Sequence, residues 1–184
     1  MKRKALQYQT VKPILRSTLD RLMEIEAFAP FRLVGGTSLS LRYGHRMSDD
    51  IDLFTDVEYG SLDFHKLQDI LRSEFPYCIG DCGDIVGFGT SYIVGNSKDD
   101  AVKLDLFNTD AFIRPVEQSE NIRMASVDDI VAMKIDVISR GGRKKDFWDL
   151  QMLHNSYSIE QMLALYEELS ASETSNAYLM CSTS

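Results

Sequence analysis

Two aspartates separated by a single residue are the first feature of this sequence that could support chemistry. Asp50 and Asp52 open a stretch in which acidic and apolar residues alternate, DIDLFT over residues 50–55, and this alternation predicts a β-strand with two different faces. Residues i and i+2 of a strand lie on the same face, and adjacent carboxylates repel each other unless a cation lies between them. Mg²⁺ prefers carboxylate oxygens together with substrate phosphate oxygens, so the pair predicts metal-assisted chemistry on a phosphate compound. Taken alone, the pair could also be a solvated strand end.

A glycine pair lies a short distance upstream of the two aspartates. Gly35 and Gly36 separate a short apolar strand, expected over residues 31–34, from a helix expected over residues 37–43. A turn of this kind directs backbone N–H groups and the positive end of a helix toward a phosphate. The alternative is a plain tight turn, because two glycines between a strand and a helix are common.

A third acid occurs on a later strand. Asp105 lies in residues 102–107, where apolar and polar residues again alternate. It could stand beside the aspartate pair, because two-metal sites need acids that hold the metals near the attacking and leaving oxygens. The alternative is an ion pair between Asp105 and Lys103 at the edge of a sheet.

The elements that must position these residues change character near residue 124. Residues 1–124 are expected to form an α+β part with a mixed sheet, and residues 125–184 a helical part. In the first part, helices are expected over residues 10–27, 37–43 and 63–75, and β-structure over residues 31–34, 50–55 and 77–107. Helices of the second part are expected to begin at Ser126, Lys144 and Ser158. The polar residues 170–184 are expected to be loosely ordered or to be a fragment of something longer.

Composition and charge narrow the class of protein. The chain has 184 residues, of which 44% are hydrophobic and 26% charged, and this suits one globular domain with a small helical appendage. A net charge of −8 argues against a non-specific nucleic-acid binder, which needs Lys and Arg for phosphate contacts. A local basic cluster nevertheless consists of Lys134, Arg140, Arg143, Lys144 and Lys145.

The sequence also predicts where the protein resides. The basic N-terminus has no apolar run behind it, so it does not resemble a signal peptide, and no stretch approaches the length of a membrane span. The three cysteines, Cys78, Cys82 and Cys181, are odd in number and form no disulfide framework. We therefore expect reduced thiols in a cytoplasmic protein that does not bind a membrane.

Four segments together resemble a known family. Residues 33–54, LVGGTSLSLRYGHRMSDDIDLF, resemble the first motif of the polymerase-β-like nucleotidyltransferases in their glycine pair, short helix and aspartate pair. The complete residue pattern of this stretch resembles the abortive-infection nucleotidyltransferase toxins of the AbiEii/AbiGii group. VKLDLF (102–107) resembles the second motif of that group. Ala132-Met133-Lys134 and SRGGRKKDFWDL (139–150) resemble its third block, so the match extends from about residue 33 to residue 153.

The resemblance implies a fold and a role for particular residues. The implied fold is the polymerase-β-like mixed sheet flanked by helices, with a C-terminal helical bundle. The residues assigned to the triphosphate are Gly35, Gly36, Thr37, Ser38 and Arg46. Those assigned to Mg²⁺ or Mn²⁺ are Asp50, Asp52 and Asp105, with Asp105 also activating the attacking hydroxyl. Those that complete the nucleotide site from the helical part are Lys134, which is counted with the catalytic residues, and Arg143, Lys145 and Asp146.

The implied reaction is in-line attack of a hydroxyl on the α-phosphate of an NTP, with release of pyrophosphate. The acceptor would be tRNA or another hydroxyl compound, and the protein would be the toxin of a toxin–antitoxin pair whose antitoxin is encoded upstream. Two alternatives stay open. One is a catalytically idle module that binds a nucleotide or an antitoxin, and the other is an aminoglycoside-type small-molecule nucleotidyltransferase. The sequence departs from many nucleotidyltransferases at Gly36, where they carry Ser. Members of the group also continue with more helices after the region equivalent to residues 159–169.

Overall fold

The chain folds into two compact units. The computed structural model describes residues 5–83 and 88–181, and for residues 172–181 it describes the backbone alone. Unit 1 consists of Met1–Thr109 and Gln118–Met124, and unit 2 consists of Asp110–Glu117 and Ala125–Ser184. The segment 110–117 thus clusters with the helices that follow residue 124. The boundary expected between residues 124 and 125 stays a prediction.

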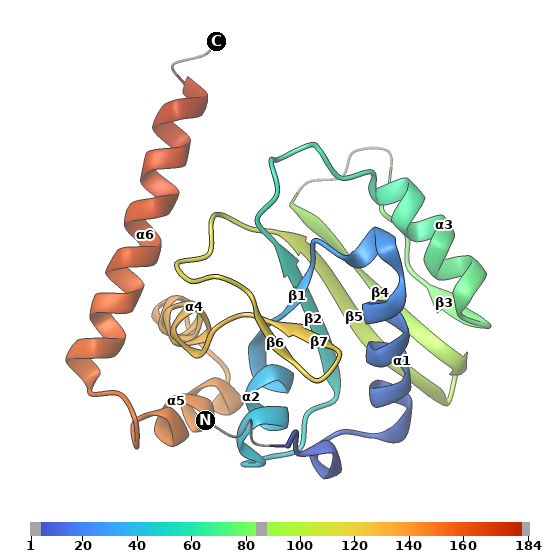
Figure 1. Ribbon diagram of the computed structural model, residues 1–184, viewed down its shortest axis with the longest axis horizontal. Coiled ribbons are helices and arrows are strands. Elements are labelled where there is room, and N and C mark those ends of the chain that lie inside the picture. Colours follow the sequence, from blue (N-terminus) through green and yellow to red (C-terminus); the bar gives the residue numbers. More distant parts are fainter. Residues whose placement is uncertain (1–4, 84–87, 182–184) are drawn as a thin grey trace. The chain divides into compact units, whose positions relative to one another are not determined.

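Unit 1 is built on a mixed β-sheet, as the sequence predicts (Figure 1). The strands are β1 (Arg32–Leu33), β2 (Asp50–Thr55), β3 (Tyr77–Ile79), β4 (Gly89–Ser97), β5 (Asp100–Asn108), β6 (Glu117–Ser119) and β7 (Ile122–Met124). Their order in the sheet is β3-β4-β5-β2-β1-β7-β6. β2 pairs with β5 in parallel and with β1 in antiparallel orientation. The mixed sheet therefore places the two acid-bearing strands side by side.

One face of the sheet is covered by helices of unit 1. These are α1 (Pro13–Glu24) and α3 (Phe64–Glu74), and the short 3₁₀ turns η1 (Tyr8–Thr10) and η2 (Glu26–Phe28) flank α1. Ile51 and Leu53 of β2 are fully buried and belong to one core cluster with Leu15 and Leu19 of α1. Because side chains alternate along a strand, Asp50 and Asp52 lie on the opposite face.

The ends of these helices have local causes. The helix expected over residues 10–27 is shorter at both ends. Pro13 occupies the first turn of α1, and Ile25 returns to an extended conformation. Asp63 starts α3, since its carboxylate accepts a hydrogen bond of 3.0 Å from the backbone N–H of Lys66. On β7, the Arg123 guanidinium donates to three backbone carbonyls, those of Met23 near the end of α1 and of Phe28 and Phe31 before β1.

In the part of unit 2 that the structure describes, the helices are α4 (Val127–Ser139), α5 (Lys144–Leu153) and α6 (Ile159–Cys181). Ser126 caps α4 by accepting from the backbone N–H of Asp129 at 3.0 Å, and Ser158 caps α6. The expectation that residues 170–184 are loosely ordered is wrong for the backbone up to Cys181, where α6 continues. The sequence of α6 contains neither Gly nor Pro, so nothing in it breaks the helix.

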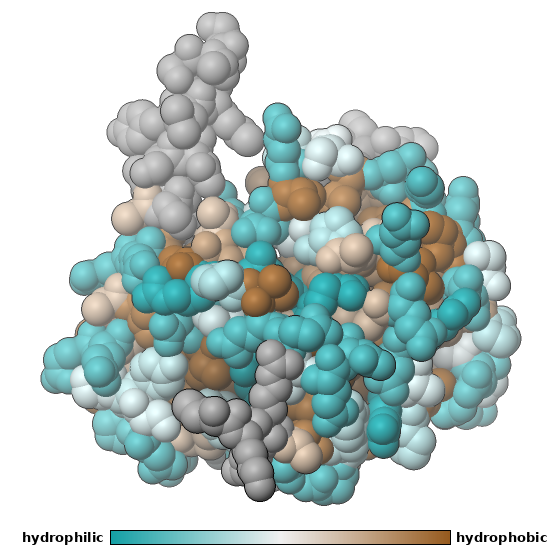
Figure 2. All heavy atoms as spheres, viewed as in Figure 1, coloured by the Kyte–Doolittle hydropathy of each residue, from teal (hydrophilic) through white to brown (hydrophobic). Residues whose placement is uncertain are grey.

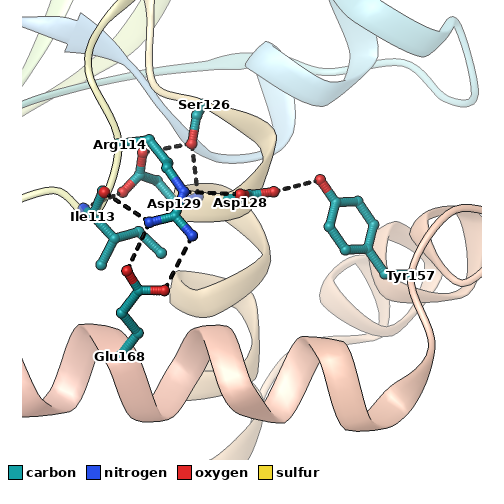
Figure 3. A network of polar contacts seen from close by, with 7 residues as sticks. All are labelled: Ile113, Arg114, Ser126, Asp128, Asp129, Tyr157 and Glu168. Atoms are coloured by element: carbon teal, nitrogen blue, oxygen red, sulfur yellow. Dashed lines mark hydrogen bonds and ion pairs between the residues drawn. The ribbon is translucent and has the colours of Figure 1, made fainter.

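Polar contacts hold the segment 110–117 to the helices of unit 2 (Figure 3). Arg114 bridges Asp128 of α4, at 3.1 Å, and Glu168 of α6, at 2.7 Å. The Asp129 carboxylate accepts from the backbone N–H of Ile113 at 2.7 Å. The hydrogen bonds from Arg114 also hold the pKa of the Glu168 carboxyl below its usual value. Three segments that are distant in sequence are therefore fixed to one another within unit 2.

The next features are the hydropathy of the surface, the apolar length of the helices and the state of the cysteines. In the view of Figure 2, hydrophobic residues form small groups separated by hydrophilic ones. Among the helices of residues 5–83 and 88–181, none is both long and apolar enough to cross a membrane. Cys78 and Cys82 carry free thiols, and the side chain of Cys181 lies outside the described residues.

Candidate active site

The glycine pair forms the first turn of α2 (Gly35–Tyr43) rather than a loop before it. The helix begins two residues earlier than the sequence pattern predicts, and Gly35 has a positive φ of 68°. The residue before it is Val34, whose side chain cannot cap the N–H groups of the first turn. The backbone N–H of Val34 donates to the Asp52 carbonyl at 2.9 Å, which fixes the start of α2 to β2.

Two charged side chains lie directly against the bare backbone of this turn. A β-carbon on Gly35 would overlap the carboxylate of Asp52, and a β-carbon on Gly36 would overlap the guanidinium of Arg46, whose Cζ would lie 3.1 Å away. Only glycine leaves room for both approaches. The structure therefore brings Asp52, Arg46 and the N-terminus of α2 together.

Strand register brings the third acid to the same place. In the parallel pairing of β2 with β5, Asp52 lies opposite Asp105 and Asp50 lies opposite Lys103. Directly opposed residues of adjacent strands point to the same face and are separated by about 5 Å. The three aspartates predicted from the sequence thus share one face of the sheet, beside the start of α2.

The carboxylate of Asp105 is already engaged. Lys103 forms an ion pair with it, and the Ser91 hydroxyl of β4 donates a hydrogen bond to it. The ion pair left open as an alternative is present, but the expectation of an edge strand is wrong, because β5 lies inside the sheet between β4 and β2. Ser91 is a contact that the sequence pattern does not indicate. As the side chains stand in the described part of the chain, no three His, Cys, Asp or Glu residues are grouped so that they could hold a metal ion. The aspartates fit Mg²⁺ in donor type and in strand placement, and a metal ion at Asp105 would share or compete for a carboxylate that already contacts Lys103 and Ser91.

The two hydroxyl residues of the turn are buried. Thr37 is 1% exposed and Ser38 is fully buried. The Thr37 hydroxyl donates to the Asp50 carbonyl and lies 2.8 Å from the Ser48 hydroxyl, so it joins α2 to β2. The Ser38 hydroxyl, in contrast, is buried without a hydrogen-bond partner among the described residues.

The residues predicted from the helical part meet in unit 2. The Lys134 ammonium of α4 lies 2.6 Å from Asp146 and 2.8 Å from Asp149, both on α5. The three side chains are 8%, 1% and 0% exposed. Arg143 donates its backbone N–H to Asp146 at 3.0 Å, while its side chain is exposed. Lys145, also assigned to the nucleotide, is half-buried on α5.

The pKa of the buried Asp146 carboxyl depends on its contact with Lys134. Burial is the largest single influence on the pKa of Asp146 and raises it. The hydrogen bond and charge of Lys134, together with the Arg143 backbone N–H, outweigh burial and hold that pKa below its usual value. Asp149 is not among the residues predicted for a site. Its spacing of three residues from Asp146 is the signal that places both carboxylates on one helix face.

Comparison with known proteins identifies relatives of this chain. The family model described as "Nucleotidyl transferase AbiEii toxin, Type IV TA system" matches residues 17–177. Among curated proteins, the uncharacterized protein aq_aa25 of Aquifex aeolicus (strain VF5) is 30% identical over 141 residues, which cover 75% of this chain and 64% of that protein.

Solved structures share the fold. JHP933 from Helicobacter pylori superposes with a TM-score of 0.55 at 25% identity, covering 78% of this chain and 64% of that chain. A second H. pylori protein, proposed to be a nucleotidyltransferase, gives a TM-score of 0.56 at 23% identity, covering 85% and 73%. An antigenic nucleotidyltransferase-like protein from Paracoccidioides brasiliensis gives 0.51 at 16% identity, covering 89% and 90%. This chain spans 64% of the length of both aq_aa25 and JHP933.

Proposed function

Since this chain belongs to the AbiEii nucleotidyltransferase toxin family, we propose that it transfers a nucleotide from an NTP to an acceptor hydroxyl, as the toxin of a toxin–antitoxin pair. The observation that carries the proposal is the placement of Asp52. It lies opposite Asp105 in the sheet and directly against Gly35 at the start of α2. Carboxylates that can bind a cation and N–H groups that can bind a phosphate therefore adjoin one another, and nucleotidyl transfer needs both.

The triphosphate is assigned to the N-terminus of α2. Backbone N–H groups of the first helical turn and the positive end of the helix attract phosphate oxygens. The guanidinium of Arg46, against Gly36, adds a cation that suits the pyrophosphate leaving group. A divalent cation, Mg²⁺ or Mn²⁺, held by Asp50, Asp52 and Asp105, would neutralise phosphate charge and favour ionisation of the acceptor hydroxyl.

The acceptor side of the reaction is assigned to Asp105. The acceptor oxygen forms a bond to the α-phosphorus, the bond between that phosphorus and the bridging oxygen breaks, and pyrophosphate leaves. The proton of the acceptor hydroxyl passes to Asp105 or to water beside it. Lys103, which already contacts the Asp105 carboxylate, would then lie beside the acceptor hydroxyl.

Further assignments rest on the family resemblance. We propose that Lys134, Arg143, Lys145 and Asp146 of unit 2 take part in nucleotide binding. We also propose tRNA as the acceptor, an antitoxin encoded upstream as the partner, and the cytoplasm as the location. The family description, a type IV toxin–antitoxin system, supports the antitoxin partner.

A second candidate is a module that binds a nucleotide without transferring it. The observation that favours it is the ion pair between Lys103 and Asp105, because the ammonium competes with a metal for the carboxylate and makes the carboxylate a weaker base. This candidate predicts NTP binding with no turnover on any acceptor.

One experiment separates the two candidates. The wild type and Asp52→Asn are incubated with each α-labelled NTP, Mg²⁺ and bacterial tRNA, and transfer of label to RNA is measured. The matched control is Asp69→Asn, an exposed aspartate on α3. We expect transfer to fall at least 100-fold in Asp52→Asn and to persist in Asp69→Asn, while circular dichroism shows both variants folded. Unchanged transfer by Asp52→Asn would overturn the proposal, and NTP binding without any transfer by the wild type would favour the binding module.

A further inference from the structure

We propose that Lys103 is a positioning residue that couples entry of the divalent cation to binding of the nucleotide. Its ammonium contacts the Asp105 carboxylate, so a cation without nucleotide meets a competitor at that acid. A cation that arrives on a triphosphate brings phosphate ligands of its own. The inference rests on the proposed function and adds the regulation of its metal site. All residues that carry it belong to unit 1.

Lys103 is one of four charged side chains at neighbouring positions on two strands. In the parallel pairing of β2 with β5, Asp50 lies opposite Lys103 and Asp52 lies opposite Asp105. Opposed residues are about 5 Å apart, and the next pair on the same face follows after about 7 Å. Three carboxylates this close repel one another, and the one ammonium among the four side chains reduces that repulsion. The sheet thus places a cation of the chain itself among the acids assigned to the metal.

Both oxygens of the Asp105 carboxylate have donors. Lys103 Nζ contacts Oδ2, and the Ser91 hydroxyl donates a hydrogen bond to Oδ1. Ser91 lies opposite Asp105 on β4, which adjoins β5 on the side away from β2 (Figure 1). The contact with Ser91 therefore directs one oxygen of Asp105 away from Asp52.

The Asp52 carboxylate is held on the opposite side. A β-carbon on Gly35 would overlap its Oδ2, and Gly35 follows shortly after β1, the other neighbour of β2. Within the described residues, no three acids are grouped so that they could hold a cation. A turn of the Asp105 carboxylate toward Asp52 would bring the acids closer and would weaken the contacts of Asp105 with Lys103 and Ser91.

The ammonium of Lys103 is free to move into water. The Lys103 side chain is 46% exposed, compared with 14% for Asp105. On β4 the residue opposite Lys103 is Ile93, an apolar side chain along which the lysine stem can lie while the ammonium stays hydrated. When a triphosphate is present, its oxygens offer the displaced ammonium a new partner. Lys103 therefore opposes a cation alone more strongly than a cation that is bound to a nucleotide.

The size of the effect follows from the charge of the ammonium. A neighbouring charge shifts the ionisation of a group by about one to three powers of ten, and the binding of a divalent cation responds to the same field. Removing the ammonium of Lys103 is therefore expected to strengthen binding of the cation alone about tenfold or more. With nucleotide bound, the phosphates attract the ammonium, so its removal should change cation binding by less than about threefold.

The test measures cation binding without turnover. Mn²⁺ is titrated into the wild type, Lys103→Met and Lys103→Arg, and free Mn²⁺ is measured by electron paramagnetic resonance. Each titration is made first with Mn²⁺ alone and then with the four NTP analogues that carry a methylene group between the α- and β-phosphates. The matched control is Lys66→Met, at an exposed lysine of α3, and circular dichroism checks that each variant is folded. Lys103→Gln replaces Lys103→Met if the latter does not fold.

We expect Lys103→Met to bind Mn²⁺ alone about tenfold more tightly than the wild type, because the competing charge is gone. Lys103→Arg keeps the charge and Lys66→Met removes a distant one, so both should bind Mn²⁺ as the wild type does. Adding Asp105→Asn to Lys103→Met should abolish the gain. With an analogue that binds, the affinities of Lys103→Met and the wild type should differ by less than about threefold.

Equal affinities of Lys103→Met and the wild type for Mn²⁺ alone would overturn the proposal. An equal gain in Lys66→Met would overturn it too, because net charge would then be the cause, and so would a tenfold gain that persists with every analogue. Absence of Mn²⁺ binding by all the proteins would also contradict it. If Lys103→Met shows the expected gain and its loss with nucleotide, but the wild type transfers no label from any NTP, the role of Lys103 stands and the proposed function fails.

Discussion

Replacing Lys134 by Met is expected to destabilise unit 2 far more than the loss of a surface lysine. The ammonium lies 2.6 Å from Asp146 and 2.8 Å from Asp149, and both carboxylates are essentially inaccessible to water. Removing one partner of a buried ion pair costs about 3–5 kcal/mol, because a charge is left buried without compensation. Protonating one carboxyl at pH 7 would relieve the repulsion, but from an ordinary pKa of about 3.9 this costs about 4 kcal/mol. Whether the carboxylate stays charged or takes up a proton, the free energy of unfolding is expected to fall by about 3–5 kcal/mol.

The stability difference between wild type and Lys134→Met is expected to change with pH in a defined direction. In the wild type the pKa of Asp146 lies below its usual value, so its contribution to stability is present above about pH 4 and is lost as the pH falls further. Without Lys134, burial remains and raises that pKa. The contribution in the variant is then present at low pH and lost as the pH rises. The difference in stability between wild type and Lys134→Met should therefore be smaller at pH 5 than at pH 7.

The assay is urea unfolding followed by tryptophan fluorescence and far-UV circular dichroism at both pH values. Trp148 is the only tryptophan of the chain and lies on α5, between Asp146 and Asp149 in the sequence. The control is Lys144→Met, which removes an exposed lysine 4.9 Å from the Trp148 ring and should cost less than about 1 kcal/mol. Adding Asp146→Asn and Asp149→Asn to Lys134→Met should restore most of the lost stability. If Lys134→Met unfolded at the same urea concentration as Lys144→Met at both pH values, the reasoning would be refuted.

Three further substitutions test other parts of the account. Gly35→Ala should lower nucleotide transfer at least tenfold, because its methyl group would displace the Asp52 carboxylate. The control is Gly83→Ala, at a glycine with a nearly equal φ of 67° and no atom of the described residues within 4 Å of its β-carbon position, which should leave transfer unchanged. Equal activities of the two variants in the transfer assay would contradict the proposed role of the turn. Arg123→Lys should lower the stability of unit 1 by about 1–3 kcal/mol in thermal unfolding, since an ammonium cannot replace a guanidinium that donates to three carbonyls, and an unchanged melting temperature would exclude this contribution. Arg114→Gln should lower stability more at low salt than at 1 M salt, because its ion pairs are partly exposed and screened by ions; a loss that is independent of salt would show that packing is the cause.

The sequence pattern predicts local features of the site because they depend on neighbouring residues. The alternation of residues 50–55 defines β2 with the observed limits and places Asp50 and Asp52 on one face. The partner of Asp52 across the sheet cannot be predicted in this way. A parallel register shifted by two residues would keep every side chain on its face and yet set Asp105 opposite Asp50. The resemblance to known motifs, and not the alternation, suggests that the acids meet.

The errors of the sequence-based predictions also have physical causes. The start of α2 is predicted two residues late because glycine is a poor helix former, while the close approach of Asp52 and Arg46 requires glycine there. Asp149 follows Asp146 by three residues and Lys145 by four, a spacing typical of an ion pair on the surface of a helix. Its burial depends on Lys134, on a different helix. Contacts of this kind are decided by packing between elements, which periodicity does not encode.

The central claim is that this protein cleaves an NTP between the α- and β-phosphates and attaches the nucleotide to an acceptor. The most direct measurement incubates the wild type with tRNA and Mg²⁺ and an NTP labelled either at the α- or at the γ-phosphate, with Asp52→Asn and Asp69→Asn in parallel. The account predicts that the α-label enters the RNA and the γ-label appears in pyrophosphate, with both signals lost in Asp52→Asn and kept in Asp69→Asn. Transfer of the γ-label to the RNA, or transfer of the α-label at the wild-type rate by Asp52→Asn, would contradict it.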